Sequence, residues 1–79
     1  MKRDGKVNIP EVVGQRIKAL IDQQNLLQRD VAYDAGIDVE NLRKYIKGQQ
    51  EMKISTLLRI AKALKIQPGL LVDNISTER

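Results

Sequence analysis

Three residues, Gly36-Ile37-Asp38, separate two short segments that carry helix signals, and this spacing constrains the fold more than any other feature of the chain. Gly36 directly follows the first segment, residues 28–35, at the position where a helix commonly ends in a left-handed conformation. Asp38 then stands where an N-cap carboxylate accepts the free backbone N–H groups of a second helix, which we expect to run to about Lys47. Two short helices joined by so tight a turn have the outline of a helix-turn-helix.

Helical periodicity predicts three further helices, and no segment alternates as a strand would. The first covers about residues 10–24, with Pro10 in its first turn, where a missing N–H costs nothing. The fourth covers about residues 54–65, and a short fifth helix begins at Gln67-Pro68. We therefore predict one compact, all-α domain of five helices. Its expected core stripes are Val13, Ile17, Leu20 and Ile21, ending at the polar Gln24, in the first helix; Val31, Ala32 and Ala35 in the second; and Ile54, Leu57, Leu58, Ala61, Leu64 and Ile66 in the fourth.

The two ends of the chain lack this periodicity. Residues 1–8 are polar and mostly basic in their charges, so they predict a flexible basic arm. Residues 73–79 predict a short C-terminal tail, which leaves residues 9–72 as the folded domain.

The composition argues against catalysis and against metal binding. The chain has no Cys and no His, so it lacks disulfides, thiolate ligands, the commonest metal ligand and the commonest general base. Asp30 and Asp34 lie four residues apart, but two solvated carboxylates near a helix start explain them better than a shared metal ion. We therefore expect no enzyme activity, no cofactor and no metal site.

No part of the sequence approaches the roughly 18–20 consecutive apolar residues that a membrane span requires. Polar residues, and not an apolar run, follow Lys2 and Arg3, so no signal peptide is visible. We expect a cytoplasmic protein with no membrane partner.

The formal net charge is +4 and the sequence pI is about 9.6. Such a charge fits a polyanionic partner, although it is equally ordinary for a small soluble domain. Tyr33 and Tyr45 are the only aromatic residues, whereas domains that bind single-stranded nucleic acid stack bases on several exposed aromatic rings. Single-strand-binding folds are therefore disfavoured.

The order and spacing of a set of residues in the second, third and fourth helices form a motif. Gln28 opens the second helix, Ala32 lies within it and Gly36 forms the turn. Leu42 lies in the third helix, Gly48 ends it, and Ile60-Ala61-Lys62-Ala63-Leu64 lies in the fourth. Ala32 suits a close crossing of two helices, and Gly36 permits the positive φ of the turn. In this order and spacing, residues 9–72 resemble the Cro/C1-type, or XRE-like, helix-turn-helix family of phage repressors and bacterial regulators. The fold that this resemblance implies is the five-helix lambda-repressor-like DNA-binding domain.

Two sites depart from the family's pattern. Leu27 stands where Ser or Thr usually caps the second helix, so we expect that cap to be lost. Ile21 and Ile46 stand where an Arg of the first helix usually pairs with a Glu of the third, and we expect an apolar contact to replace the ion pair.

The resemblance implies that the third helix enters the major groove of double-stranded DNA and that its N-terminal residues meet base edges. Lys44 suits guanine, Asn41 suits adenine, Glu40 suits cytosine and Val39 suits a thymine methyl group. Glu40 and Lys44 also have the spacing of a simple i,i+4 ion pair on a solvated helix face. The expected base contacts are Val39, Glu40, Asn41 and Lys44, while Leu42, Tyr45 and Ile46 share the opposite, inward face of the helical wheel.

The resemblance also implies phosphate contacts, which position a protein on DNA without specifying sequence. Gln28 anchors the start of the second helix, and the remaining residues lie near or after the end of the third. The arm of residues 1–8 has two interpretations: it reaches the minor groove or a phosphate, or it is merely disordered. We favour disorder in the free protein. The expected phosphate contacts are Gln28, Arg43, Lys47, Gln49, Gln50 and Lys53.

One domain of this kind reads only a few base pairs, so a homodimer is expected. Leu70, Leu71, Val72 and Ile75 exceed what one small core can cover, which makes them the expected interface unless the core buries all four. The function implied is that of a transcriptional regulator, in particular a repressor, that binds double-stranded DNA sequence-specifically. The alternative is an antitoxin or another protein whose main partner is a protein such as a toxin, with the C-terminal tail as the candidate contact.

Overall fold

A computed structural model describes residues 8–75 of the 79-residue chain. These residues form no strand, which confirms the predicted all-α fold, and the predicted arm lies outside them except for Asn8. No helix in this part of the chain is long and apolar enough to cross a membrane. The helices are α1 (Ile9–Gln23), α2 (Gln28–Ala35), α3 (Val39–Ile46), α4 (Ile54–Leu64) and α5 (Gly69–Val72).

Side chains at both ends of α1 fix its position. Asn8 Oδ1 accepts a 3.0 Å hydrogen bond from the Glu11 backbone N–H, and Pro10 occupies the first turn. At the other end, Gln24 Nε2 donates a 2.9 Å hydrogen bond to the backbone carbonyl oxygen of Leu64. That carbonyl is one of those that the end of α4 leaves without a partner inside the helix, so α1 and α4 are tied together there.

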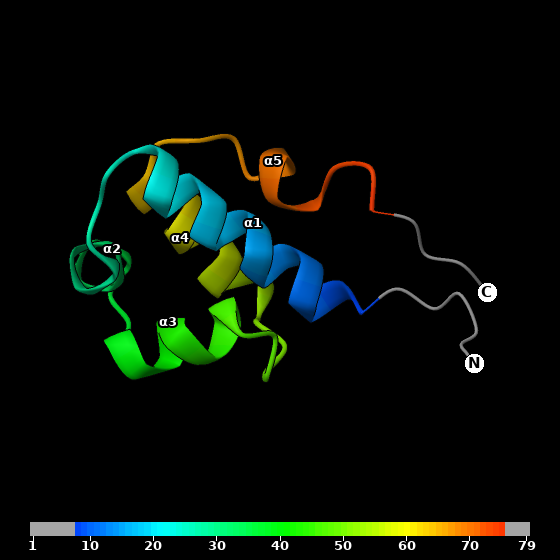
Figure 1. Cartoon of the computed structure of the whole chain (residues 1–79), viewed down its shortest axis with the longest axis horizontal. Coiled ribbons are helices and arrows are strands. Elements are labelled where there is room, and N and C mark those ends of the chain that lie inside the picture. Colours follow the sequence, from blue (N-terminus) through cyan, green and yellow to red (C-terminus); the bar gives the residue numbers. More distant parts are fainter. Residues whose placement is uncertain (1–7, 76–79) are drawn as a thin grey trace.

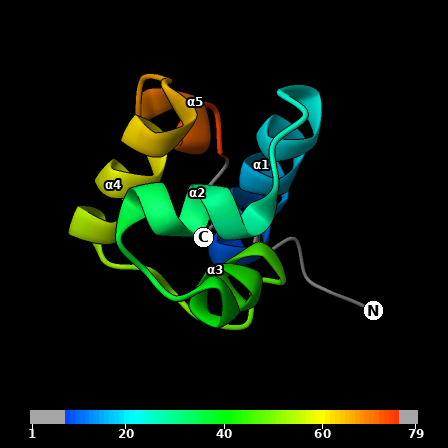
Figure 2. The same ribbon diagram turned by 90° about the vertical axis from the view of Figure 1, so that its left-hand side faces the viewer.

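The five helices pack around one core (Figures 1 and 2). α2 contacts both α3 and α4, while α1 contacts α3 and α5. Figure 2 shows α3 along the lower edge of the bundle and α5 at the upper edge. α3 is therefore presented at one edge of the molecule. The largest fully buried side chains are Ile17, Ile21, Val31, Leu42, Ile60, Leu64 and Leu71.

The buried face of α4 differs from the predicted stripe. Ile54 and Leu58 are 74% and 46% exposed, so their expected place in the core is wrong. Ile60, which the stripe omits, is fully buried beside Ala61 and Leu64. Apolar residues run almost continuously along this helix, and the rotation that turns Ile60 inward is set by packing against α2, which is the main neighbour of α4.

The first residues of the expected C-terminal tail lie against the domain. Arg16 Nη1 donates a 2.6 Å hydrogen bond to the backbone carbonyl oxygen of Asp73, and Ile75 packs half-buried against the core. The segment that directly follows Val72 is thus held by α1. The rest of the expected tail, residues 76–79, lies outside the described residues.

Candidate nucleic-acid interface

The turn between α2 and α3 fixes how the two helices meet. Gly36 adopts the left-handed conformation that the sequence predicts, with φ 73° and ψ 32°. Its N–H donates to the Tyr33 carbonyl oxygen at 3.1 Å, and the Ile37 N–H donates to the Ala32 carbonyl oxygen at 3.0 Å. These two hydrogen bonds end α2 abruptly, and Ile37 packs against the core just beyond them. The chain can therefore reverse direction and begin α3 within three residues.

Neither short helix has a side-chain cap at its start. Leu27 occupies the N-cap of α2 without a capping hydrogen bond, which confirms the expected loss. Asp38 occupies the N-cap of α3, but its carboxylate makes no capping hydrogen bond either, so that part of the prediction is wrong. The Asp38 side chain is exposed, and solvation of its carboxylate competes with the backbone N–H donors.

α3 is divided lengthwise into a buried face and an exposed face. Leu42 exposes none of its surface and Tyr45 exposes 8%, which confirms their predicted inward direction. Glu40, Lys44 and the following Lys47 are all exposed. The charged side chains therefore project from the edge of the bundle that α3 forms.

The four expected base-contacting residues are not equally presented. Glu40 and Lys44 are exposed, whereas Val39 is half-buried and packs against the core. Asn41 is half-buried on the flank of α3 that faces α4. Glu40 Oε2 lies 3.0 Å from Arg43 Nη1, so the ion pair considered with Lys44 forms instead with Arg43, three residues along the helix.

The expected phosphate-contacting residues lie on both flanks of α3. Gln28, the first residue of α2, lines a groove together with Arg43 and the exposed Leu27. Gln50 and Lys53 line a second groove, on the opposite flank of α3. The remaining two, Lys47 and Gln49, are exposed at the end of α3 and the start of the following loop.

Two glycines bring α1 into close contact with the end of α3. The sequence predicts that Gly48 ends the third helix, but it predicts this close contact for neither glycine. A Cβ at Gly14 would overlap the backbone carbonyl groups of Tyr45 and Ile46. Gly48 has φ 72°, and a Cβ there would stand 2.7 Å from Glu11 Cα. A glycine inside a helix costs roughly 1 kcal/mol relative to alanine, so Gly14 within a predicted helix is the signal that points to such an approach.

The proposed apolar replacement for the family's ion pair is compatible with the packing. Ile21 is buried, and Ile46 packs half-buried against the same core. The Ile46 backbone faces Gly14, whereas Ile21 lines the groove that also contains Gln28 and Arg43. Direct contact between the Ile21 and Ile46 side chains stays a prediction.

The four residues expected at a dimer interface have different environments. Leu71 exposes none of its surface, because the single turn of α5 needs a buried residue to stay docked. It is therefore part of the core and is not available to a partner. Leu70 and Val72 are 52% and 45% exposed, and Ile75 is half-buried. Val72 also borders an apolar cleft together with the exposed Ile54.

Two helices joined by the Gly36 turn, with the second helix presented at an edge of a helical bundle, define a helix-turn-helix protein. The chain belongs to the Cro/C1-type HTH DNA-binding domain family, whose sequence profile matches residues 16–75. It is similar to the uncharacterized HTH-type transcriptional regulator y4wC of Sinorhizobium fredii, with 32% identity over 62 residues. The match covers 78% of this chain and 43% of that relative, so the chain spans less than half of the relative's length.

Solved structures share the fold. The restriction-modification controller protein C.AhdI from Aeromonas hydrophila is 29% identical, with a TM-score of 0.77, over 78% of this chain and 94% of its own. The P22 c2 repressor protein, solved in complex with a synthetic operator, is 22% identical, with a TM-score of 0.73, over 81% of this chain and 97% of its own. The predicted lambda-repressor-like fold and the family resemblance are therefore confirmed.

Proposed function

We propose that this domain binds double-stranded DNA sequence-specifically and regulates transcription as a repressor. The observation that carries the proposal is the division of α3, in which Leu42 and Tyr45 bury one face while Glu40 and Lys44 stand exposed at an edge of the molecule. A helix presented in this way fits the major groove, where each base pair displays its own pattern of donors and acceptors. In this proposal the protein acts in the cytoplasm, by binding and not by catalysis.

Glu40 and Lys44 carry most of the base recognition in this proposal. The Lys44 ammonium group donates to guanine O6 and N7, and the Glu40 carboxylate accepts from cytosine N4. Arg43 already holds the Glu40 carboxylate at 3.0 Å, which limits its rotation before DNA binds. Val39, half-buried at the start of the helix, would touch a thymine methyl group with the part of its side chain that stays exposed. Asn41 faces the flank toward α4, so it reaches only the edge of the base-contacting surface.

Phosphate contacts on both flanks would set the depth and direction of α3 in the groove. On one flank, Gln28 stands at the start of α2, where no side chain caps the helix and its first N–H groups attract an anion. Arg43 lies beside it. On the other flank the contacts are Lys47, Gln49, Gln50 and Lys53.

We propose that the domain works as a homodimer through the edge that carries α5. Leu70 and Val72 supply exposed apolar surface, with the half-buried Ile75 beside them in the chain. A twofold dimer whose two copies of α3 lie about one turn of DNA apart would match a palindromic operator.

Selection of bound duplexes from a random pool tests the proposal. We expect an enriched sequence with two half-sites about one helical turn apart. Lys44→Ala should relax the preference at one base pair of each half-site by about 1–3 kcal/mol. Lys62→Ala, another exposed lysine but on α4, is the matched control and should leave the preference unchanged. Recovery of all sequences with equal frequency would contradict the proposal.

A further inference from the structure

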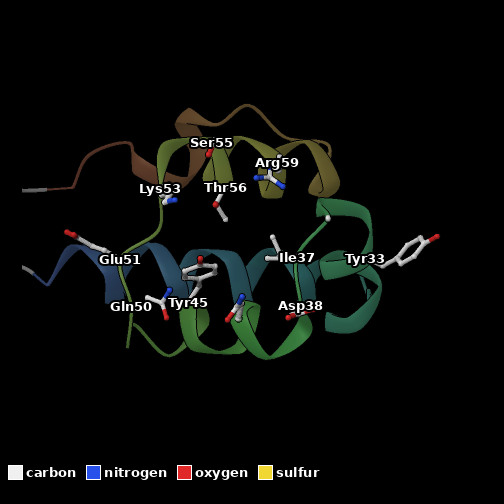
Figure 3. A pocket seen from close by; sticks show the side chains of 12 residues that line it. Tyr33, Ile37, Asp38, Tyr45, Gln50, Glu51, Lys53, Ser55, Thr56 and Arg59 are labelled. Carbon is white, nitrogen blue, oxygen red and sulfur yellow. The ribbon is translucent and has the colours of Figure 1, made fainter.

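A groove between α3 and α4 shares Asn41, Gln50 and Lys53 with the contacts proposed above. Its volume is about 770 Å³, and it is lined from α2, α3, α4 and the loop between α3 and α4 (Figure 3). Gln50 and Lys53 at one end belong to the proposed phosphate contacts. Glu40 and Lys44, the main proposed base-contacting residues, are not among its lining residues.

Two nearly buried residues that carry hydroxyl groups line this groove. Tyr45 is 8% exposed and Thr56 is 7% exposed, and in Figure 3 their side chains extend toward each other from α3 and α4. Neither hydroxyl makes a hydrogen bond with any residue between 8 and 75. Because these two hydroxyls have no protein partner in the described part of the chain, they are available to donate to a molecule that enters the groove.

Two cationic side chains, from α4 and from the loop before it, also line this groove. Lys53 and Arg59 line the groove, and neither forms an ion pair within the described part of the chain. Arg59 Nη1 lies 3.6 Å from the place that a Cβ on Gly36 would occupy, so the guanidinium group stands beside the turn between α2 and α3.

Two carboxylates also line the groove. In Figure 3 Asp38 lies under the α2–α3 turn, and Glu51 lies at the far end of the groove, with its side chain directed outward. The groove therefore combines the donors of Arg59, Tyr45 and Thr56 with the carboxylates of Asp38 and Glu51.

We propose that this groove binds a small oxyanion, namely inorganic phosphate or the phosphate group of a small metabolite. A phosphate offers acceptors in several directions, and the planar guanidinium of Arg59 can hold two of its oxygens. The hydroxyls of Tyr45 and Thr56 donate to the remaining oxygens, and Lys53 balances the charge.

Occupancy of the groove would weaken DNA binding, a consequence that rests on the proposed function. Lys53 and Gln50 serve both sites, so a bound anion would neutralise and occupy groups that otherwise contact the DNA backbone. The anion would also contact Tyr45 on α3 itself. The groove would therefore act as a regulatory site for a phosphorylated small molecule.

Titration of the free protein with inorganic phosphate, followed by backbone amide NMR shifts, tests the site. Sodium chloride at matched ionic strength controls for screening. We expect saturable shifts at Gly36, Thr56 and Arg59 with phosphate only. Arg59→Gln and the isosteric Thr56→Val should each weaken binding roughly tenfold, since each removes a donor to a charged group. Lys62→Gln, one turn further along α4, should have no effect. Shifts that chloride reproduces, or that Arg59→Gln leaves unchanged, would overturn the proposal.

A second experiment separates a free anion from a DNA phosphate, because both present the same chemistry. In a competition assay at constant ionic strength, inorganic phosphate should displace duplex DNA from the wild-type protein more strongly than from Arg59→Gln. If Arg59→Gln weakens duplex binding while free phosphate leaves the groove amides unmoved, the groove takes a backbone phosphate and the proposal fails. The NMR titration contains no DNA, so its result is independent of whether the domain recognises an operator.

Discussion

Gly14 is the residue that allows α1 to approach the end of α3. Any side chain there would meet the backbone carbonyl groups of Tyr45 and Ile46, which cannot move without shifting the helix that carries them. Helix propensity favours alanine over glycine by roughly 1 kcal/mol, so the presence of glycine reflects packing and not local preference.

We expect Gly14→Ala to lower the free energy of unfolding by about 1–3 kcal/mol, because overpacking against backbone outweighs the gain in helix propensity. Urea unfolding followed by circular dichroism measures the change. Gln15→Ala, at the neighbouring exposed position, is the control and should change stability little. A Gly14→Ala protein as stable as the wild type would show that the contact with α3 is loose.

Residue directions were predictable from the sequence where burial decides them, as for Leu42 and Tyr45, since a helical wheel has one apolar face. The polar contacts were not. Glu40 has possible partners three and four residues along the helix, and each such pair contributes only about 0.2–0.5 kcal/mol, so the sequence does not decide which pair forms. The missing capping hydrogen bond of Asp38 could not be predicted for a similar reason, because its exposed carboxylate can bind water instead of the backbone N–H groups of α3.

At the scale of the helices, the turn residues predicted the boundaries well because they act locally. Gly36 and Gly48 both adopt positive φ where the sequence places the ends of the two short helices. The rotation of α4 could not be predicted in the same way. Its side chains at Ile54, Leu58 and Ile60 are all apolar, and only the surrounding helices decide which one is buried.

α2 lacks the side-chain cap that most helices gain from Ser, Thr, Asp or Asn, and this can be repaired. We expect Leu27→Ser to raise the free energy of unfolding by about 0.5–2 kcal/mol, because its hydroxyl can accept one of the free N–H groups at the start of α2. Thermal and urea unfolding measure the gain. Leu26→Ser, at the preceding loop position, removes a similar apolar side chain without creating a cap and should not stabilise the protein. Equal effects of the two variants would argue against an N-cap at residue 27.

At the scale of the whole molecule, α3 and α5 lie at opposite edges of the bundle, with α1 in contact with both (Figure 2). The proposed DNA-binding and self-association surfaces are therefore separate. The exposed apolar surface of Leu70 and Val72 could be anticipated from the excess of apolar residues, whereas the burial of Leu71 depends on how the single turn of α5 docks.

This separation makes self-association testable without affecting α3. We expect Leu70→Asp to shift the protein to monomer in sedimentation equilibrium and to reduce affinity for a two-half-site duplex far more than for a single half-site. Ala19→Asp, which introduces the same charge at an exposed position of α1, is the control. If wild type and Leu70→Asp sediment identically at every concentration, Leu70 is not part of a dimer interface.

The exposed residues of α3 have a further consequence. Glu40, Lys44 and Lys47 make no contribution to the buried side of the helix, which Leu42 and Tyr45 anchor on their own. Their identities can drift during evolution, or be grafted from a related protein as a set, without a penalty in folding. Under the proposed function, substitutions at Glu40 and Lys44 would change the preferred DNA sequence while the fold stays the same.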